Sequence, residues 1–139
     1  MSLERFCRKR VVTVSPTQSV SEAARKMREE HVGLVVVEEG GKPVGILTDR
    51  DVTCRVVAEG REAKALPVGE VMSRDVVVAQ RDSLLDEVVV AMRRRGVRRI
   101  PIVDADGKVA GLVSLDDLTV LFAAELHQLA AAVRENQGP

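Results

Sequence analysis

Apolar residues recur at helical spacing in two stretches of the chain. Residues 20–27 place Val, Ala, Ala and Met at positions i, i+3, i+4 and i+7, and residues 85–92 place Leu, Val, Val and Met in the same way. This spacing puts the apolar side chains on one face of an α-helix. It predicts two amphipathic helices, one ending near Glu30 and the other at Gly96, because glycine favours a helix C-terminus.

Continuous apolar runs predict two buried strands. Leu34–Val37 and Ile100–Val103 are apolar throughout, which is typical of strands covered on both faces. The helical stretches and the strand regions share one offset, 65 residues, and residues 41–52 match residues 107–118 after one inserted residue. Three blocks in register predict an internal duplication.

Each copy is predicted to fold as β-α-β-β-α. The first helix has the capping-box residues Ser19 and Glu22 at its start. Asp49 and the Leu115–Asp116 junction are expected to cap the second helices. The remaining strands are expected at Val11–Val14, Val76–Val78, Val44–Thr48 and Val109–Ser114.

The predicted fold class is α/β (α+β), with two copies related by a pseudo-twofold axis. A single unit of roughly 55 residues would bury too little surface to be secure alone, so the two sheets are expected to pack together. The expected division of the chain is residues 8–62, a linker at 63–70, residues 71–122 and a helical extension at 123–139.

The extension predicts an association surface. A helix over residues 118–133 would carry an apolar stripe beyond the second copy, and a stripe of this length favours a homodimer contact. The stripe comprises Leu121, Phe122, Leu126, Leu129, Ala130 and Val133.

Composition narrows the classes of function. The 21 basic residues balance the 21 acidic ones, and the only aromatic residues are two Phe. This makes nucleic acid an unfavoured partner, and the apolar runs are too short to span a bilayer. Cys7 and Cys54 form no CxxC and the first ten residues contain no secretion signal. They therefore predict free thiols in a cytoplasmic protein.

One pattern carries chemistry in both copies. Thr48 ends a predicted strand and is followed three residues later by Asp51; Ser114 and Asp117 repeat the arrangement. Residues i and i+3 lie on one helix face, so hydroxyl and carboxylate face the same cleft. An ionised carboxylate accepts hydrogen bonds, and a ribose diol offers two adjacent donors. The residues alone leave two interpretations open: a ligand site, or ordinary helix capping.

The chain resembles the CBS-domain family, specifically a stand-alone tandem pair known as a Bateman module. The resemblance covers about residues 8–122 and rests on Met72 and on the sequences at residues 45–52, 97–104 and 111–118. It implies two clefts that bind adenosine-containing ligands such as AMP, ADP, ATP or S-adenosylmethionine, with no covalently bound cofactor. In that case Asp51 and Asp117 would bind ribose, with Thr48 and Ser114 beside ribose or phosphate.

The resemblance also implies where adenine would lie. Each cleft is expected to borrow its adenine walls from the other copy, using Thr13, Val32, Gly33, Val76 and Val97.

The two clefts are not expected to be equivalent. Arg98 and Arg99 lie where many family members hold phosphate, whereas Gly33 and Leu34 occupy the matching positions of the first copy. The cleft that draws on Arg98, Arg99 and Arg50 is therefore the expected phosphate site. A solvated basic face is the alternative interpretation of the first two arginines.

Three functions follow as hypotheses. The first is a regulatory sensor, not an enzyme, whose ligand changes how its dimer or an unidentified protein partner is engaged. The second is a structural or partner-binding module with empty clefts, and the third a nucleic-acid binder using residues 93–99. No metal site is expected, because His31 and His127 have no Cys or His neighbour at ligand spacing.

Overall fold

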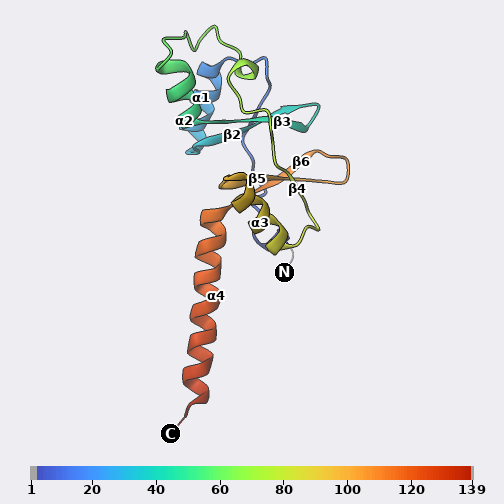
Figure 1. Ribbon diagram of the computed structural model, residues 1–139, viewed down its shortest axis with the longest axis vertical. Coiled ribbons are helices and arrows are strands. Elements are labelled where there is room, and N and C mark those ends of the chain that lie inside the picture. The colour runs from blue at the N-terminus through green and yellow to red at the C-terminus, as the bar shows by residue number, and fades with distance from the viewer. Residues whose placement is uncertain (1–2, 139) are drawn as a thin grey trace.

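The computed structural model describes residues 3–138 and confirms a duplicated α+β fold with two three-stranded sheets (Figure 1). The first sheet has the strand order β1-β2-β3, with β1 parallel to β2 and β3 antiparallel to it. The elements of the first repeat are β1 (Thr13–Val14), α1 (Val20–Glu30), β2 (Leu34–Glu39), β3 (Lys42–Thr48), α2 (Asp49–Val52) and a π-helical turn, η2 (Thr53–Val57).

The second repeat has the same topology. Its sheet has the order β4-β5-β6, again with one parallel and one antiparallel pair. Its elements are β4 (Ala79–Gln80), α3 (Leu85–Arg95), β5 (Arg99–Val103), β6 (Val109–Ser114) and α4 (Leu115–Asn136), and 3₁₀ turns at Leu3–Arg5 (η1) and Val68–Glu70 (η3) precede the two repeats.

The central strands have two buried faces. In β2, Val35 and Val37 belong to the core between the sheet and its own helices, whereas Val36 is fully buried outside that cluster. Ile100 and Ile102 of β5 lie in the second core, and Val103 is again buried outside it. Successive side chains of a strand point to opposite faces, so the second face of each sheet turns toward the other repeat. The sheets pack together as the sequence predicts.

The ends of the first helices also follow the sequence. Ser19 and Glu22 form the capping box, with Glu22 N donating to Ser19 Oγ and Ser19 N donating to the Glu22 carboxylate. Gly96 ends α3 with a φ of 64°, in the left-handed region that glycine adopts without strain. His31 ends α1 in the same region, at φ 55°.

The predicted caps of the second helices are wrong by one residue. Thr48 and Ser114, rather than Asp49 and the Leu115–Asp116 junction, are the N-cap residues of α2 and α4. Both have extended backbone, and each hydroxyl accepts the N–H three residues later. An N-cap residue requires this geometry, so the last strand residue is also the cap.

The short strand predicted at Val76–Val78 is also misplaced. The parallel pair with β5 begins only at Ala79, opposite Ile102, and β1 is likewise confined to Thr13–Val14. β-branched residues alone do not make a strand where no partner strand is within reach.

The segment before each repeat docks on the other repeat. Leu3 and Phe6 are buried in the second core, while Leu66, Val68 and Met72 are buried in the first. The expected linker at residues 63–70 thus contributes two core residues.

Backbone hydrogen bonds hold these two segments in equivalent places. Arg8 exchanges two with Leu112 of β6, and Ser73 exchanges two with Ile46 of β3. Each segment crosses a strand beside a buried glycine, Gly111 or Gly45, where an added Cβ would lie 1.9 Å from Cys7 Sγ or 2.3 Å from Met72 Sδ.

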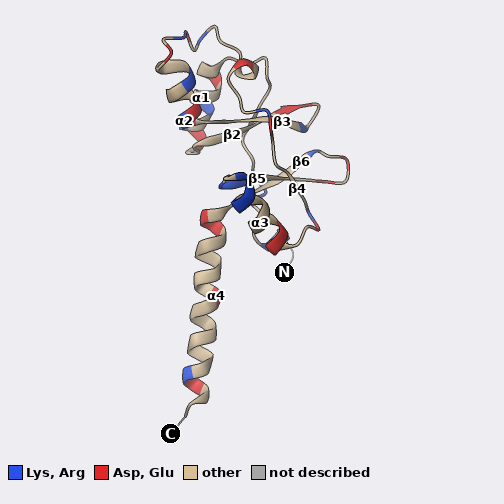
Figure 2. Ribbon diagram, viewed as in Figure 1, with Lys and Arg blue, Asp and Glu red and all other residues tan. Residues whose placement is uncertain are grey.

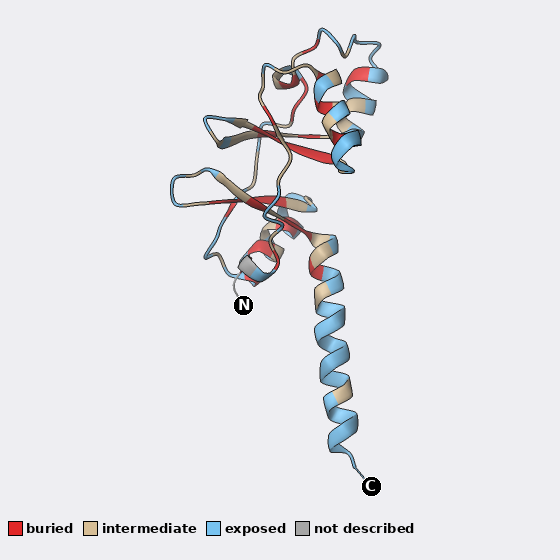
Figure 3. Cartoon of the chain, turned by 180° about the vertical axis from the view of Figure 1, so that it is seen from behind, coloured by how far each residue is buried: buried red, intermediate tan, exposed pale blue. Residues whose placement is uncertain are grey.

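Helix α4 leaves the body of the molecule (Figure 1). It begins directly at Ser114, so the second helix of the repeat and the predicted extension form one helix of 22 residues. Only Leu118 of this helix is buried against the domain, and the rest is largely exposed (Figure 3). Among residues 3–138, no helix has the length and apolar character needed to cross a membrane.

Candidate functional site

The first cleft, here called the Asp51 cleft, lies between the end of β3 and the second repeat. It has a volume of about 380 Å3, within the usual size range of small-molecule sites. Its first-repeat lining is Leu34, Ile46, Thr48, Arg50 and Asp51, and its second-repeat lining is Ser73, Asp75, Val76, Val77, Gly96, Val97, Arg98 and Arg99.

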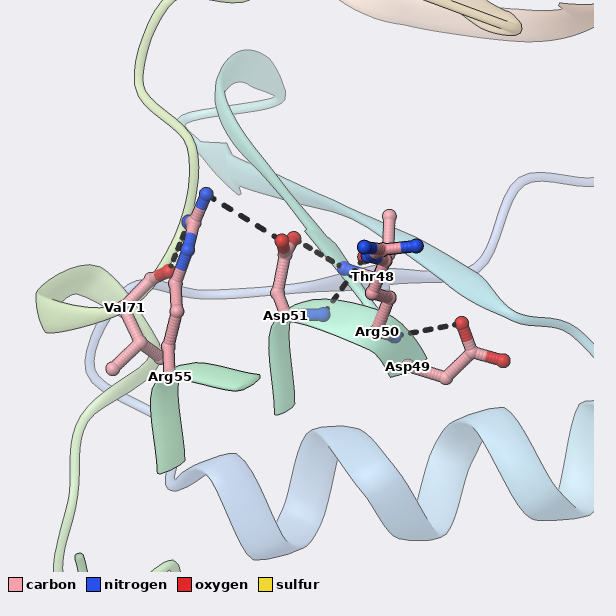
Figure 4. A network of polar contacts seen from close by, with 6 residues as sticks. All are labelled: Thr48, Asp49, Arg50, Asp51, Arg55 and Val71. Atoms are coloured by element: carbon pink, nitrogen blue, oxygen red, sulfur yellow. Dashed lines mark hydrogen bonds and ion pairs between the residues drawn. The ribbon is translucent and has the colours of Figure 1, made fainter. Parts of the chain in front are cut away.

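The Thr48–Asp51 pair is a reciprocal capping box (Figure 4). Asp51 N donates to Thr48 Oγ1 over 3.1 Å, and Thr48 N donates to Asp51 Oδ2 over 2.9 Å. The other carboxylate oxygen, Oδ1, lies 3.5 Å from an Arg55 guanidinium nitrogen, and Arg55 also donates to the carbonyl of Val71. Capping therefore fixes the carboxylate in the cleft while Oδ1 retains acceptor capacity.

Three arginines line this cleft, together with the acidic residues Asp51 and Asp75. Arg50 follows the cap directly, and within the described part of the chain its guanidinium forms no hydrogen bond or ion pair (Figure 4). Arg98 contacts Asp116 in an exposed ion pair. Arg99 is half-buried and lines both clefts. Figure 2 shows the basic cluster that ends α3 close to the start of β5.

The second cleft, the Asp117 cleft, is smaller, at about 190 Å3. Its second-repeat lining is Arg99, Leu112, Ser114, Asp116 and Asp117, and its first-repeat lining is Arg8, Arg10, Val11, Val12, His31, Val32, Gly33 and Leu34.

The Asp117 carboxylate has a different partner from that of Asp51. Arg8 donates from Nε to Oδ2 over 2.9 Å and from Nη2 to Oδ1 over 2.8 Å, so one guanidinium engages both oxygens. These hydrogen bonds are the main reason that the pKa of Asp117 lies below its ordinary value; burial acts in the opposite direction. The same pairing raises the pKa of Arg8. Asp117 is therefore held ionised.

The structure brings together eleven of the twelve residues proposed from the sequence. Thr48, Asp51, Arg50, Val76, Val97 and Arg98 line the Asp51 cleft, and Ser114, Asp117, Val32 and Gly33 line the Asp117 cleft, with Arg99 in both. Each cleft is thus lined by residues of both repeats.

Thr13 is the exception. It lies in β1 and lines a separate shallow hollow, whereas Val11 and Val12 occupy the cleft wall. The residues just before β1 and β4 line the two clefts. The residues within β1 pair with the central strand β2, and Thr13 lies outside the cleft.

Sequence reasoning missed the residues supplied by the docked segments. Arg8 and Arg10 line the Asp117 cleft, and Ser73, Asp75 and Val77 line the other. The 65-residue offset between the repeats could have indicated these residues, because it makes Arg8 equivalent to Ser73. Among residues 3–138, no three His, Cys, Asp or Glu side chains are grouped as metal ligands would be.

Comparison with known proteins identifies the repeated unit. The family model described as "CBS domain" matches residues 3–57 and 68–123. The chain is 43% identical over 110 residues to the CBS domain-containing protein YhcV of Bacillus subtilis, covering 79% of this chain and 77% of that protein. It is 38% identical over 119 residues to the uncharacterized protein MK0525 of Methanopyrus kandleri, covering 85% of this chain but only 61% of the relative.

A solved structure has the same arrangement. The CBS domain pair of protein MJ0100, in complex with 5'-methylthioadenosine and S-adenosyl-L-methionine, has a TM-score of 0.77 and 27% sequence identity. The match covers 88% of this chain and 99% of that chain. Two family matches on one chain, joined to this architecture, establish that the protein belongs to the CBS-domain family and contains a tandem CBS pair.

Proposed function

We propose that the protein is a regulatory module that binds an adenosine-containing ligand in the clefts between its repeats. The observation that carries the proposal is the geometry of the Asp51 cleft. There the Asp51 carboxylate, with one oxygen engaged by the backbone, shares the cleft with Val76 and Val97 of the other repeat and with Arg50.

Each part of such a ligand has a matching surface in this cleft. The ribose diol would donate to Asp51 Oδ1 and to the outer lone pair of Oδ2. Adenine would lie against Val76 and Val97, which offer apolar contact without hydrogen-bonding groups. A phosphate would be neutralised by Arg50 and Arg99, because guanidinium binds phosphate in a two-pronged manner.

The relative MJ0100 supports this assignment, since its CBS pair holds 5'-methylthioadenosine and S-adenosyl-L-methionine. For the present chain, AMP, ADP, ATP and S-adenosylmethionine are all candidates, and the cationic rim favours those that carry phosphate. The ligand would be exchangeable, with no covalently bound cofactor.

The proposed role is regulation, not catalysis. Thr48, Asp51 and the Ser114 hydroxyl are held in helix-capping hydrogen bonds, and the Asp117 carboxylate is held by Arg8. Ligand binding would act on the neighbouring repeat, because every cleft is built from both. A module with empty clefts remains the second candidate, favoured by the stability of the capping box without a ligand. We further propose a cytoplasmic location, since neither Cys7 nor Cys54 forms a disulfide in the part of the chain that the structure describes.

We also propose a homodimer formed through α4. Phe122, Leu126, Leu129 and Val133 are spaced four, three and four residues apart, the repeat of a two-helix seam. Leu126 and Leu129 are 67% and 65% exposed, which is costly for a helix in water. The charged residues of α4 lie at its ends, apart from Glu125 at mid-helix (Figure 2), and none of them is one of the four seam residues.

A thermal-shift series tests the proposed ligand class. Each of AMP, ADP, ATP and S-adenosylmethionine is added at millimolar concentration while unfolding is followed. A ligand at 100 times its Kd stabilises the fold by about 2.7 kcal/mol. For a chain of this size we expect a rise in melting temperature of about 8–10 °C. No shift with any adenosine compound would favour the empty-cleft module, and salt-sensitive oligonucleotide binding would favour the nucleic-acid function.

A further inference from the structure

The two clefts differ in the hydrogen-bond partners of their aspartate side chains, Asp51 and Asp117. Both oxygens of Asp117 accept hydrogen bonds from Arg8, a residue outside the repeat that contains Asp117. Asp51 is instead held by the Thr48 backbone, with Arg55 at 3.5 Å. A ribose diol can therefore reach Asp51 Oδ1 directly, whereas at Asp117 one guanidinium already spans both oxygens in the two-pronged way in which a diol would bind them.

Arg8 occupies the position in the first repeat that is equivalent to Ser73 in the second. It lies 65 residues before Ser73, and each of the two exchanges a pair of backbone hydrogen bonds with the third strand of the opposite repeat. The backbone thus delivers residue 8 and residue 73 to equivalent positions. One cleft receives a neutral, short side chain there, and the other receives a guanidinium.

The segment that carries Arg8 is anchored on the second repeat. Leu3 and Phe6 are buried in the second core, and Arg8 N and O both bond to Leu112 over 2.8 and 3.0 Å. The Arg8 side chain is nevertheless 65% exposed. The guanidinium can therefore leave Asp117 by rotation of its side chain, without movement of the segment.

We propose that Arg8 makes the Asp117 cleft selective for phosphorylated adenosine ligands over uncharged adenosine. This inference rests on the proposed function of the clefts. A ribose diol that takes Asp117 deprives Arg8 of its acceptors. A phosphate on the same ligand gives the guanidinium a new two-pronged partner, whereas adenosine leaves it with none. The Asp51 cleft requires no such exchange and accepts both ligand types.

The neighbouring charges fit this selectivity. Arg10 and Arg99 also line the Asp117 cleft, and Arg10 is engaged by Glu30 over 2.6 Å. The acidic Asp116 at the rim contacts Arg98. Among the described residues, Asp116 at the rim and the nearby Glu30 thus already have arginine partners, and the ligand's phosphate would be the replacement partner of displaced Arg8.

The test isolates the Asp117 cleft in an Asp51→Ala background and measures AMP and adenosine affinities by calorimetry. We expect this parent to bind AMP at least tenfold more tightly than adenosine. Adding Arg8→Ser, which installs the residue of the other segment, should strengthen adenosine binding about tenfold, because hydrogen bonds to charged groups are among the stronger ones. The preference for AMP should fall by a similar factor.

Two further variants keep the test decisive. Lys9→Ser removes the same charge from the adjacent residue, which lies outside both clefts, and should change neither affinity. Arg8→Lys keeps a cation for phosphate but loses the two-pronged grip on Asp117. It should therefore bind adenosine more tightly and retain a preference for AMP. Thermal unfolding of each variant verifies that it is folded.

The outcomes separate this inference from the proposed function. Equal binding of AMP and adenosine in the parent, or unchanged adenosine affinity in Arg8→Ser, would overturn the inference. So would an Asp117 cleft that binds neither ligand in any variant, while wild-type protein binds AMP through Asp51. Wild-type protein that binds neither compound would instead refute the proposed function itself.

Discussion

Arg8 and Asp117 form the ion pair whose energetics are simplest to measure. Asp117 is 29% exposed in its side chain and Arg8 is 65% exposed, so solvent weakens their attraction. The pair is two-pronged, and it lowers the pKa of Asp117. Its contribution therefore depends on the ionisation of this single carboxylate.

The pH dependence of stability should reveal this contribution. A carboxyl whose pKa is lowered by folding stabilises the protein fully above its unfolded pKa, near 3.9. The stabilisation is lost as the pH falls from that value through the lower folded pKa. Urea unfolding should show Arg8→Ser less stable than wild type by about 1 kcal/mol or less at pH 7. The gap should begin to narrow as the pH falls below about 4 and should close below the folded pKa of Asp117; a constant gap would assign the effect to packing.

For individual residues, the sequence indicated the hydroxyl and carboxylate groups of the two clefts, but it did not indicate that Arg8 occupies the Asp117 carboxylate. Hydroxyl and carboxylate were predictable because their three-residue spacing has a fixed geometry on a helix. Arg8 was not, because its place depends on a long-range crossing that local spacing does not contain. Thr13 illustrates the same limit: its strand position was approximately predicted, but the direction in which the strand leaves the cleft wall was not.

Among the elements, β3 and β6 are the strands that the segments before the two repeats cross. β6 is crossed by the segment at Cys7 and Arg8, and β3 by the segment at Met72 and Ser73. Both crossings require a glycine, since backbone oxygen of the crossing segment lies 3.1 Å from the position of an added Cβ. Gly45 and Gly111 thus have a packing role that their place in the repeated motif alone did not reveal.

A substitution at the second crossing should destabilise the fold. In Gly111→Ala the new Cβ would lie 1.9 Å from Cys7 Sγ and 3.1 Å from the backbone oxygen of Arg8. Overpacking of this kind typically costs about 1–3 kcal/mol in unfolding free energy, measurable by urea denaturation. Gly138→Ala has an uncrowded site, 3.9 Å from the nearest atom outside its chain neighbours, and should change little.

A second substitution identifies the clash. Cys7→Ala removes the sulfur and leaves Cys7 Cβ, which is 3.6 Å from the added atom. The double variant should therefore be more stable than Gly111→Ala alone. Strictly additive losses would show that the Cys7 sulfur is not the atom that excludes a side chain at residue 111.

The repeat elements were largely predictable because apolar periodicity survives in both copies. The amphipathic helices and central strands appear where the spacing indicates, and the capping box of α1 is confirmed. The start of β4 was not predictable from its valines, because a two-residue parallel strand is defined by its partner. The second-helix caps were misassigned for a similar reason: the cap belongs to the residue with extended backbone.

For the whole molecule, α4 is the feature that the fold alone does not account for. It is a 22-residue helix whose apolar stripe remains exposed (Figure 3). The two cores are complete without it, apart from its first turns, which include the buried Leu118. Its stripe therefore fits association better than internal packing.

Light scattering should show this association. The chain has a mass of 15.1 kDa, so a homodimer would scatter as two such masses. Leu126→Lys places a charge in the seam and should shift the equilibrium toward monomer, by about tenfold or more in Kd. Gln128→Lys adds the same charge outside the stripe and should have little effect. A single chain mass at all concentrations for wild type would contradict the homodimer.

Calorimetry on the Asp51 cleft tests the central claim most directly. AMP and 2'-deoxy-AMP are titrated into wild type, Asp51→Ala and Asp49→Ala, the last removing an identical charge from a residue outside the clefts. Losing a hydrogen bond to a charged group costs about 1.5–3 kcal/mol, or roughly tenfold to hundredfold in Kd. We expect wild type and Asp49→Ala to favour AMP over its 2'-deoxy form by this factor at their tighter site, and Asp51→Ala to lose that site. Tight binding of AMP that survives Asp51→Ala with its stoichiometry unchanged would show that the carboxylate only caps α2.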